Sequence, residues 1–252
     1  MAEWPDGVGR HILPRCDSTN AEALRLAPNL SNPAWIMTRE QVAGRGRRGR
    51  AWVSGLRNFA ASLALRPVGP PAQVAQLSFV AALALHEALA QVAGPSARLA
   101  LKWPNDVLLN GGKVAGILLE SAGRGPQVDA LALGIGVNLA SAPDAAALEP
   151  GALRPVSLAA ETGANVSPDD FLDLLAPAFA GWQAVHAAQG FAPIRQAWLA
   201  RAARLGEQIT ARTGATEQTG IFEGIDPDGA LILTTAAGRS VIAAADVHFP
   251  KG

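Results

Sequence analysis

Residues 44–50 read GRGRRGR and form the densest concentration of chemically useful side chains in the sequence. The arginines carry planar guanidinium groups that match phosphate or carboxylate oxygens in pairs, and the glycines let the backbone approach a ligand closely. The segment therefore predicts a loop that binds an anion. Taken alone, it is as typical of an arginine-rich nucleic-acid segment or a solvated basic loop.

A second cluster, KWPND at residues 102–106, places two oxygen-bearing side chains, Asn105 and Asp106, beside a lysine and a tryptophan. Carboxylate and amide oxygens hold Mg²⁺ when the ion also bridges substrate phosphates. In isolation these five residues are better explained as a buried tryptophan next to a turn. The arginine segment upstream shifts the interpretation toward a phosphate site with Asn105 and Asp106 on its metal side.

Several familiar kinds of site are missing from the sequence. No G-x-x-x-x-G-K-[ST] phosphate loop occurs, and residues 134–139 lack the third glycine of a dinucleotide fingerprint. The four histidines have no metal-ligand spacing and accompany no nucleophile elbow. Triad hydrolysis and zinc chemistry are therefore disfavoured, and any nucleotide must be held in another way.

The composition indicates a globular protein without a nucleic-acid partner. Hydrophobic residues make up 49% of the 252 residues and charged residues 17%, which is typical of a folded chain. Lysine plus arginine balance aspartate plus glutamate at 21 each, so the arginine cluster is a local feature of a neutral protein. No secretory pattern or run of about 18 uncharged apolar residues is visible, and we predict a cytoplasmic protein with no membrane partner.

The spacing of apolar residues predicts the elements that must position these motifs. Ser18, Thr19 and Asn20 precede the first helix, where a hydroxyl or amide side chain can cap it. A Gly-rich turn at residues 110–112 predicts a hairpin that places Lys113 at the start of a strand. We expect helices at residues 21–27, 73–92, 155–163, 168–188 and 191–204, and strands at 34–38, 58–65, 98–103, 107–109, 113–120 and 128–133.

The pattern changes from residue 205 onward. Short β-prone pieces at residues 208–212, 219–225, 230–235 and 240–243 are separated by glycines and an Asp-Pro-Asp-Gly turn. This part predicts a small separate β-barrel. We therefore divide the chain into two domains, residues 1–204 and 205–252.

In their order, these motifs resemble those of biotin protein ligases: Ser-Thr-Asn at residues 18–20, Gln41 with GRGRRGR, KWPND, the KVAGI that begins at Lys113, and GIGVN at residues 134–138. The resemblance implies an α+β fold, with a mixed β-sheet flanked by helices as in class II synthetases and a C-terminal SH3-like β-barrel. Because Ser18 lies almost at the start, we expect a form of the family without the N-terminal DNA-binding domain.

The implied reaction has two steps. Biotin and Mg-ATP first give biotinyl-5′-AMP and pyrophosphate, and a lysine of a biotin carboxyl carrier protein domain then attacks the mixed anhydride. The residues agree with this chemistry, because a carboxylate that attacks a phosphate is an anion approaching an anion, and positioned cations lower that barrier. The carboxylate is already ionised at pH 7, so no histidine base is needed.

The resemblance also assigns residues. Arg47 and Lys113 are the expected catalytic cations, Trp52 is the expected adenine-stacking aromatic, and Mg²⁺ is expected at Asn105 and Asp106. The residues expected to bind biotin and the adenylate are Ser18, Thr19, Asn20, Gln41, Gly44, Arg45, Gly46, Arg47, Trp52, Lys113, Gly116, Gly136 and Asn138.

Two other functions stay open at this point. A lipoate or octanoate ligase or transferase acylates a similar carrier lysine on a related fold, although we do not expect it to combine GRGRRGR with KWPND. A nucleic-acid-binding module could use the arginine segment, although neutral charge and the lack of interleaved aromatics count against it. The expected partners are the carrier-protein domain, ATP and biotin, and a homodimer is consistent with the sequence.

Overall fold

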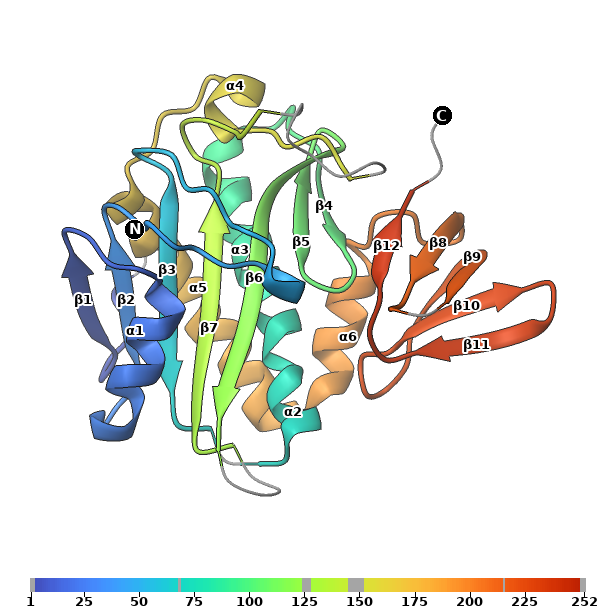
Figure 1. Ribbon diagram of the computed structural model, residues 1–252, viewed down its shortest axis with the longest axis horizontal. Helices are drawn as coiled ribbons and strands as arrows, with labels where there is room; N and C mark the ends of the chain where they lie inside the picture. The colour runs from blue at the N-terminus through green and yellow to red at the C-terminus, as the bar shows by residue number, and fades with distance from the viewer. Residues whose placement is uncertain (1–2, 68, 124–127, 145–151, 215, 250–252) are drawn as a thin grey trace.

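The computed structural model describes residues 3–67, 69–123, 128–144, 152–214 and 216–249. A seven-stranded sheet with helices on both faces is followed by a smaller five-stranded sheet at its side (Figure 1). This arrangement agrees with the predicted α+β fold, a mixed sheet flanked by helices.

The large sheet has the strand order β1-β2-β3-β7-β6-β5-β4. Strands β1 and β2 are parallel, and every other neighbouring pair is antiparallel. The central strands are nearly continuous apolar runs because both of their faces are covered. The strands are β1 (Gly9–Leu13), β2 (Ala34–Thr38), β3 (Phe59–Leu65), β4 (Leu99–Lys102), β5 (Asp106–Leu109), β6 (Gly112–Ala122) and β7 (Ala130–Val137).

Helices pack on both faces of this sheet (Figure 1). Helix α1 covers one face through small residues, with Ala23 against a cluster that includes Ile36 and Ala132. The other face carries the main core beneath α3 and α5. The helices are α1 (Thr19–Leu26), α2 (Pro71–Ala75), α3 (Leu77–Ala93), α4 (Leu158–Thr162), α5 (Pro168–Gln189) and α6 (Phe191–Leu199), with 3-10 turns η1 (Ala27–Asn29) and η2 (Arg47–Gly49).

Helix α3 is apolar around most of its circumference because it lies between the sheet and the outer helices. The stretch Pro71–Ala93, with a mean hydropathy of 1.3, is long and apolar enough to cross a bilayer, but 67% of it is buried inside the fold. Its composition is therefore explained by its place in the core.

The smaller sheet has the order β11-β10-β9-β8-β12, with every pair antiparallel. Five short strands agree with the predicted SH3-like domain, but the sheet does not close into a barrel within the described residues. Its edge strand β12 is only three residues long and pairs with β8. The strands are β8 (Gln208–Arg212), β9 (Glu217–Ile225), β10 (Leu231–Thr235), β11 (Gly238–Ile242) and β12 (Asp246–His248).

The small sheet docks on the large domain through its Asp-Pro-Asp-Gly turn. Trp103 Nε1 donates a 3.0 Å hydrogen bond to the carbonyl of Gly229 in this turn. A Cβ added to Gly229 would lie 2.7 Å from the Phe79 ring. Arg195 on α6 also donates to the carbonyl of Ile225. The turn is thus a contact between the two parts as well as a loop.

Several element boundaries differ from those predicted. The predicted helix at 155–163 begins only at Leu158, because Pro155 pairs with Lys113 instead. The predicted helix at 191–204 ends at Leu199, because Ala202 pairs with β4. Strand β7 continues to Val137, whereas the pattern predicted that it ends at residue 133. Strands β1 and β12 were not predicted, because each is short and lacks a clear apolar alternation.

We expect the Gly229→Ala substitution to destabilise the protein more than Gly206→Ala does. Both glycines have positive φ, 88° and 80°, but no atom lies within 4 Å of a Cβ at Gly206. Backbone strain should cost about 1 kcal/mol at either position, and the overlap with Phe79 should add about 1–3 kcal/mol at Gly229 alone. Urea unfolding of the two variants measures the difference, and equal losses would show that the Phe79 contact contributes nothing.

Candidate active site

A cavity of about 500 Å³ lies between the N-terminus of α1, the strands β6 and β7, and the arginine loop, by which we mean residues 44–50. Residues 246–248 of the small sheet complete its wall. Most of the residues that the sequence predicted for substrate or metal line this cavity: Ser18, Thr19, Asn20, Gln41, Arg45, Gly46, Arg47, Trp52, Asn105, Asp106, Lys113, Gly116, Gly136 and Asn138.

Gly44 is the predicted residue that does not line the cavity. A Cβ at this position would lie 2.4 Å from Nε2 of Gln41 and 2.5 Å from the Trp52 carbonyl. Gly44 therefore lets the arginine loop pack closely against Gln41, and it acts on the shape of the loop rather than on the cavity surface.

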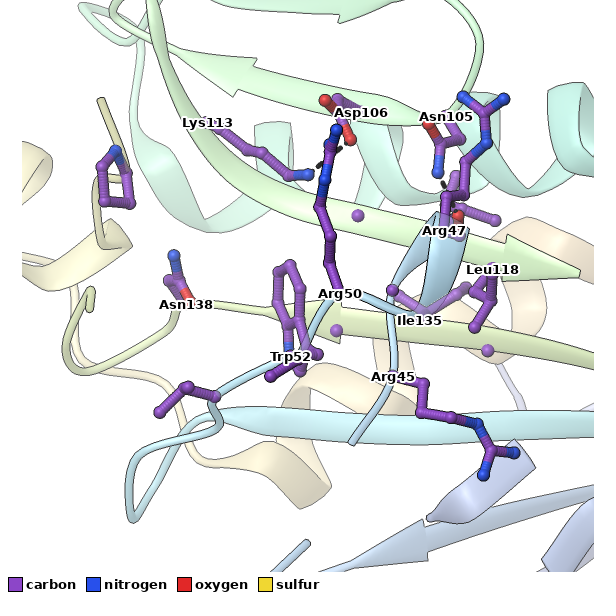
Figure 2. A pocket seen from close by; sticks show the side chains of 18 of the residues that line it. Arg45, Arg47, Arg50, Trp52, Asn105, Asp106, Lys113, Leu118, Ile135 and Asn138 are labelled. Carbon is purple, nitrogen blue, oxygen red and sulfur yellow. Dashed lines mark hydrogen bonds and ion pairs between the residues drawn. The ribbon is translucent and has the colours of Figure 1, made fainter. Parts of the chain in front are cut away.

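The floor of the cavity is free of side chains where Trp52 lies. Gly116 on β6 is paired with Gly136 on β7. A Cβ at Gly136 would come within 2.4 Å of the Trp52 ring, and one at Gly116 within 3.3 Å. Figure 2 shows the Trp52 ring against these strands, near the strand that carries Ile135. The two glycines thus make room for the indole on the sheet.

The inner end of the cavity is polar. Gln41 Oε1 accepts hydrogen bonds from the Thr19 backbone N–H at 2.9 Å and from the Thr19 hydroxyl at 3.2 Å. The Gln41 side chain therefore caps α1, whereas the predicted cap, Ser18, makes no side-chain capping bond. Ser62 donates to both Thr19 and Asn20, at 2.7 and 2.6 Å, so the polar groups are held in fixed positions.

Asn20 extends this network across the sheet. Its side-chain amide donates to Glu120 at 2.8 Å and to the Leu118 carbonyl at 3.2 Å. A Cβ at Gly134 would lie 2.2 Å from the Asn20 side-chain oxygen, which explains the first glycine of the GIGVN motif. Glu120 in turn pairs with Arg45 at 3.4 Å. The motifs at residues 18–20 and 134–138 are therefore in direct contact.

Asp106 and two lysines form a buried charge cluster at the opposite wall (Figure 2). Lys113 Nζ lies 2.7 Å from Asp106 Oδ1, and Lys102 Nζ lies 3.6 Å from Oδ2. Burial alone would raise the pKa of Asp106, but the ammonium groups of Lys113 and Lys102 outweigh it and lower the pKa. Burial lowers the pKa of Lys102, and Asp106 partly offsets this effect. The cluster keeps positive charge at the cavity wall.

The arginines of the loop lie at the opening of the cavity. In Figure 2 the Arg45 side chain points away from those of Arg47 and Arg50. Burial lowers the pKa of Arg47, while the carboxylates of Asp246 and Asp106 act in the opposite direction. A guanidinium stays protonated in proteins, so the opening keeps its positive charge.

The predicted metal residues do not form a metal site by themselves. Asp106 already neutralises two lysines, and the Asn105 amide donates to the Ile117 carbonyl at 2.5 Å. No group of three or more His, Cys, Asp or Glu side chains suited to a metal occurs among the described residues. A magnesium ion at this place would have to displace Lys113 from Asp106, so these two residues do not fit Mg²⁺ as they stand.

Asn138 has a structural contact in addition to its place in the cavity wall. Its side-chain amide donates to the Val156 carbonyl at 3.1 Å. Val156 N–H donates to the Lys113 carbonyl, and the Lys113 N–H donates to the Arg154 carbonyl, both at 2.9 Å. Asn138 thus fixes the segment that pairs with the backbone of Lys113.

Two groups of cavity residues were missed by the sequence analysis. Lys102 and Pro104 belong to KWPND, and their place beside Asp106 was already a signal in that motif. Residues 246–248 gave no signal, because nothing in a short tail strand shows that it returns to motifs about 200 residues earlier.

Comparison with known proteins decides the family. The model of the biotin/lipoate A/B protein ligase family matches residues 12–138, and the model of the biotin protein ligase C-terminal domain matches residues 205–249. The chain belongs to the biotin protein ligase family. The second match covers the small sheet, whose last strand completes the cavity wall.

Relatives agree with this assignment. The chain is 69% identical to the biotin–[acetyl-CoA-carboxylase] ligase of Paracoccus denitrificans, over 94% of this chain and 99% of that protein. It is 32% identical to the bifunctional ligase/repressor BirA of Bacillus subtilis, over 96% of this chain but 74% of that protein. The biotin protein ligase of Aquifex aeolicus in complex with biotin and ATP has 25% identity and a TM-score of 0.78, with 97% and 99% of the two chains covered.

We expect Asp106→Asn to lower the free energy of unfolding by about 3 kcal/mol, because it leaves the buried Lys102 without its counter-charge. The stabilisation exists above the ordinary aspartate pKa, near 4, and is lost as the pH falls through the lower pKa of the folded protein. The difference between the two proteins should therefore shrink in acid.

The matched control is Asp106→Asn combined with Lys102→Met, which removes the unpaired ammonium as well. Denaturant unfolding at pH 7 and pH 4 measures all three proteins. The double variant should recover most of the loss. If the double variant is as unstable as the single one, the cluster does not stabilise the protein through charge.

Proposed function

We propose that this protein is an ATP-dependent ligase that activates biotin as biotinyl-5′-AMP and transfers it to a lysine of a biotin carboxyl carrier protein domain. The observation that carries the proposal is the division of the cavity into a fixed polar end, a glycine floor with an indole, and a cationic opening. An acyl adenylate needs these three environments, for a polar head group, a flat base and a phosphate.

Biotin would occupy the polar end. Its ureido ring carries one carbonyl and two N–H groups, and the side chains of Thr19, Asn20 and Gln41 offer both donors and acceptors there. The adenine would stack on Trp52, which the glycines of β6 and β7 let lie close to the sheet. The phosphate would then lie between the arginine loop and Lys113.

In the first step, a carboxylate oxygen of biotin attacks the α-phosphorus, the bond to the bridging oxygen breaks, and pyrophosphate leaves. Both reactants are anions, so the reaction depends on cations that are in place beforehand. Arg47 and Lys113 both line the cavity and would contact the phosphate from the loop and from the sheet. Lys113 has three N–H donors, so its pairing with Asp106 is compatible with contact to a phosphate oxygen.

In the second step, the amine of the carrier lysine attacks the carbonyl carbon of the mixed anhydride, an amide bond forms, and AMP leaves. ATP is expected to arrive as its magnesium complex, in which the metal lowers the charge of the phosphates. The described carboxylates do not supply a site for this ion. Arg47 and Lys113 can contact the phosphate without it.

We extend the proposal to the organisation of the protein. Residues 1–204 would carry the adenylation chemistry, and residues 205–252 would form the C-terminal domain. We propose a cytoplasmic enzyme whose macromolecular partner is the carrier domain rather than nucleic acid, in line with the neutral net charge. The homodimer stays a prediction from sequence.

We expect ATP–pyrophosphate exchange to depend on biotin. Lipoate and octanoate have no ureido ring to occupy the polar end, so they should support less than about 1% of the exchange, as is usual when buried polar groups lose their partner. Exchange of labelled pyrophosphate with each acid in turn is the measurement. Equal exchange with octanoate would favour the lipoate-type alternative, and no exchange with any acid would contradict both.

Arg47→Ala and Lys113→Ala should each lower the rate of adenylate formation by about 100-fold or more, because each removes a charge placed for the transition state. The matched control is Arg239→Ala, which removes an exposed arginine that pairs with Glu223 in the small sheet. Single-turnover formation of biotinyl-adenylate measures the rate, and circular dichroism checks folding. Near-normal rates in both cavity variants would contradict the proposed roles.

A further inference from the structure

Three arginines of the loop converge on one carboxylate of the C-terminal domain. Asp246 Oδ2 lies 2.7 Å from Arg50 Nη2 and 2.9 Å from Arg48 Nη1. Arg47 Nη1 lies 3.9 Å from Asp246 Oδ1 and donates a 3.2 Å hydrogen bond to the Ala245 carbonyl. The Asp246 side chain is only 13% exposed. These contacts join residues that are almost 200 positions apart in the chain.

The same contacts hold a backbone conformation that is unfavourable by itself. Arg48 has a φ of 56°, in the left-handed region that non-glycine residues seldom adopt. Its guanidinium is held from two sides, by Asp246 and by the Arg212 carbonyl at 3.3 Å. Both partners belong to the small sheet. The turn of the arginine loop is therefore stabilised from outside the loop.

Little else within the loop can hold this shape. It has short-range backbone bonds, such as Gly46 N–H to the Arg50 carbonyl at 2.7 Å. Its side chains have almost no apolar surface to bury, and neighbouring guanidiniums repel one another. Burial would raise the pKa of Asp246, but Arg50, Arg48 and Arg47 lower it overall, so the carboxylate stays ionised at neutral pH.

We propose that Asp246 is a positioning residue for adenylation: it holds the arginine loop in the shape that presents Gly46 and Arg47 to the phosphates of ATP before the nucleotide arrives. Asp246 neutralises one of three positive charges, so the loop keeps a net positive charge for its ligand. Fixing the loop in advance lowers the entropy cost of binding. The inference rests on the proposed function, and it gives the C-terminal domain a part in the first chemical step.

The test is Asp246→Asn, which removes the charge and keeps the shape of the side chain. We expect the KM for ATP in biotin-dependent exchange to rise about 10-fold, because the loop must now be ordered by the nucleotide. Biotin affinity, measured by calorimetry without ATP, should stay unchanged. Trypsin should cut after residues 45–50 faster than in the wild type, as mass spectrometry of the peptides shows.

The matched control is Glu223→Gln, which removes a carboxylate from an exposed ion pair in the same sheet. It should leave the KM for ATP and the cleavage of the loop unchanged. A second variant, Arg48→Gln, tests the pair from the loop side and should also raise the KM. If Asp246 acts through Arg48, the double variant should be much less impaired than the product of the two single effects.

Three results would overturn the inference. An unchanged KM with unchanged cleavage would show that Asp246 is an ordinary surface charge. A lower KM in Asp246→Asn would show that the carboxylate competes with phosphate instead of positioning the loop. Fully multiplicative effects in the double variant would show that Asp246 does not act through Arg48.

The inference and the proposed function fail in different ways. If the wild type shows no biotin-dependent exchange, the proposed function fails. Trypsin cleavage of the arginine loop does not depend on any substrate, so it still tests the anchor at Asp246. Equal cleavage of wild type and Asp246→Asn in the absence of ligand would overturn the anchor while leaving the proposed function intact.

Discussion

A flat ring can lie against a β-sheet only where the strands carry no side chains to hold it away. Gly116 and Gly136, side by side on β6 and β7, create such a surface, and Gly134 does the same for Asn20. Alanine at either position on β7 would bring a Cβ within about 2.5 Å of atoms that are already in place. The depth of the cavity, and therefore the positions of Trp52 and the polar end, depend on these missing side chains.

Charge is held at this surface by a repeated device. Asp106 lies between two lysines, and Asp246 lies among three arginines. In both clusters one carboxylate is outnumbered, so it fixes the cations in place without cancelling their charge. The desolvation that burial imposes on Lys102 is met by a partner, and an excess positive potential remains in the cavity. This is the arrangement that a reaction between two anions requires.

Local patterns were enough to predict most of the large domain. Strand β2 and helix α5 have nearly the predicted bounds, because their apolar spacing and their caps are local signals. The motifs that line the cavity were also recognisable, since glycine, arginine and amide residues in those patterns have few other uses. The helix predicted to begin at residue 155 was wrong at its start, because tertiary pairing of Pro155 with Lys113 prevailed over helical spacing.

Contacts between distant segments could not be predicted in the same way. The sequence predicted that the arginine loop needs an anion, but it gave no indication that Asp246 supplies one. The cap of α1 by Gln41 was likewise hidden, because Ser18 satisfies the usual pattern of a capping residue. In both cases the partner is chosen by the packing of separate elements, and no local spacing records that choice.

The position of Asp246 late in the sequence has a consequence for biosynthesis. A ribosome makes the arginine loop, KWPND and the GIGVN strand well before it reaches the residue that anchors the loop. A nascent or prematurely terminated chain that stops short of β12 therefore carries nearly every recognisable motif but lacks the carboxylate among its arginines. Completion of the site is thus coupled to completion of translation, which delays a fully ordered site until the last strand has been made and docked.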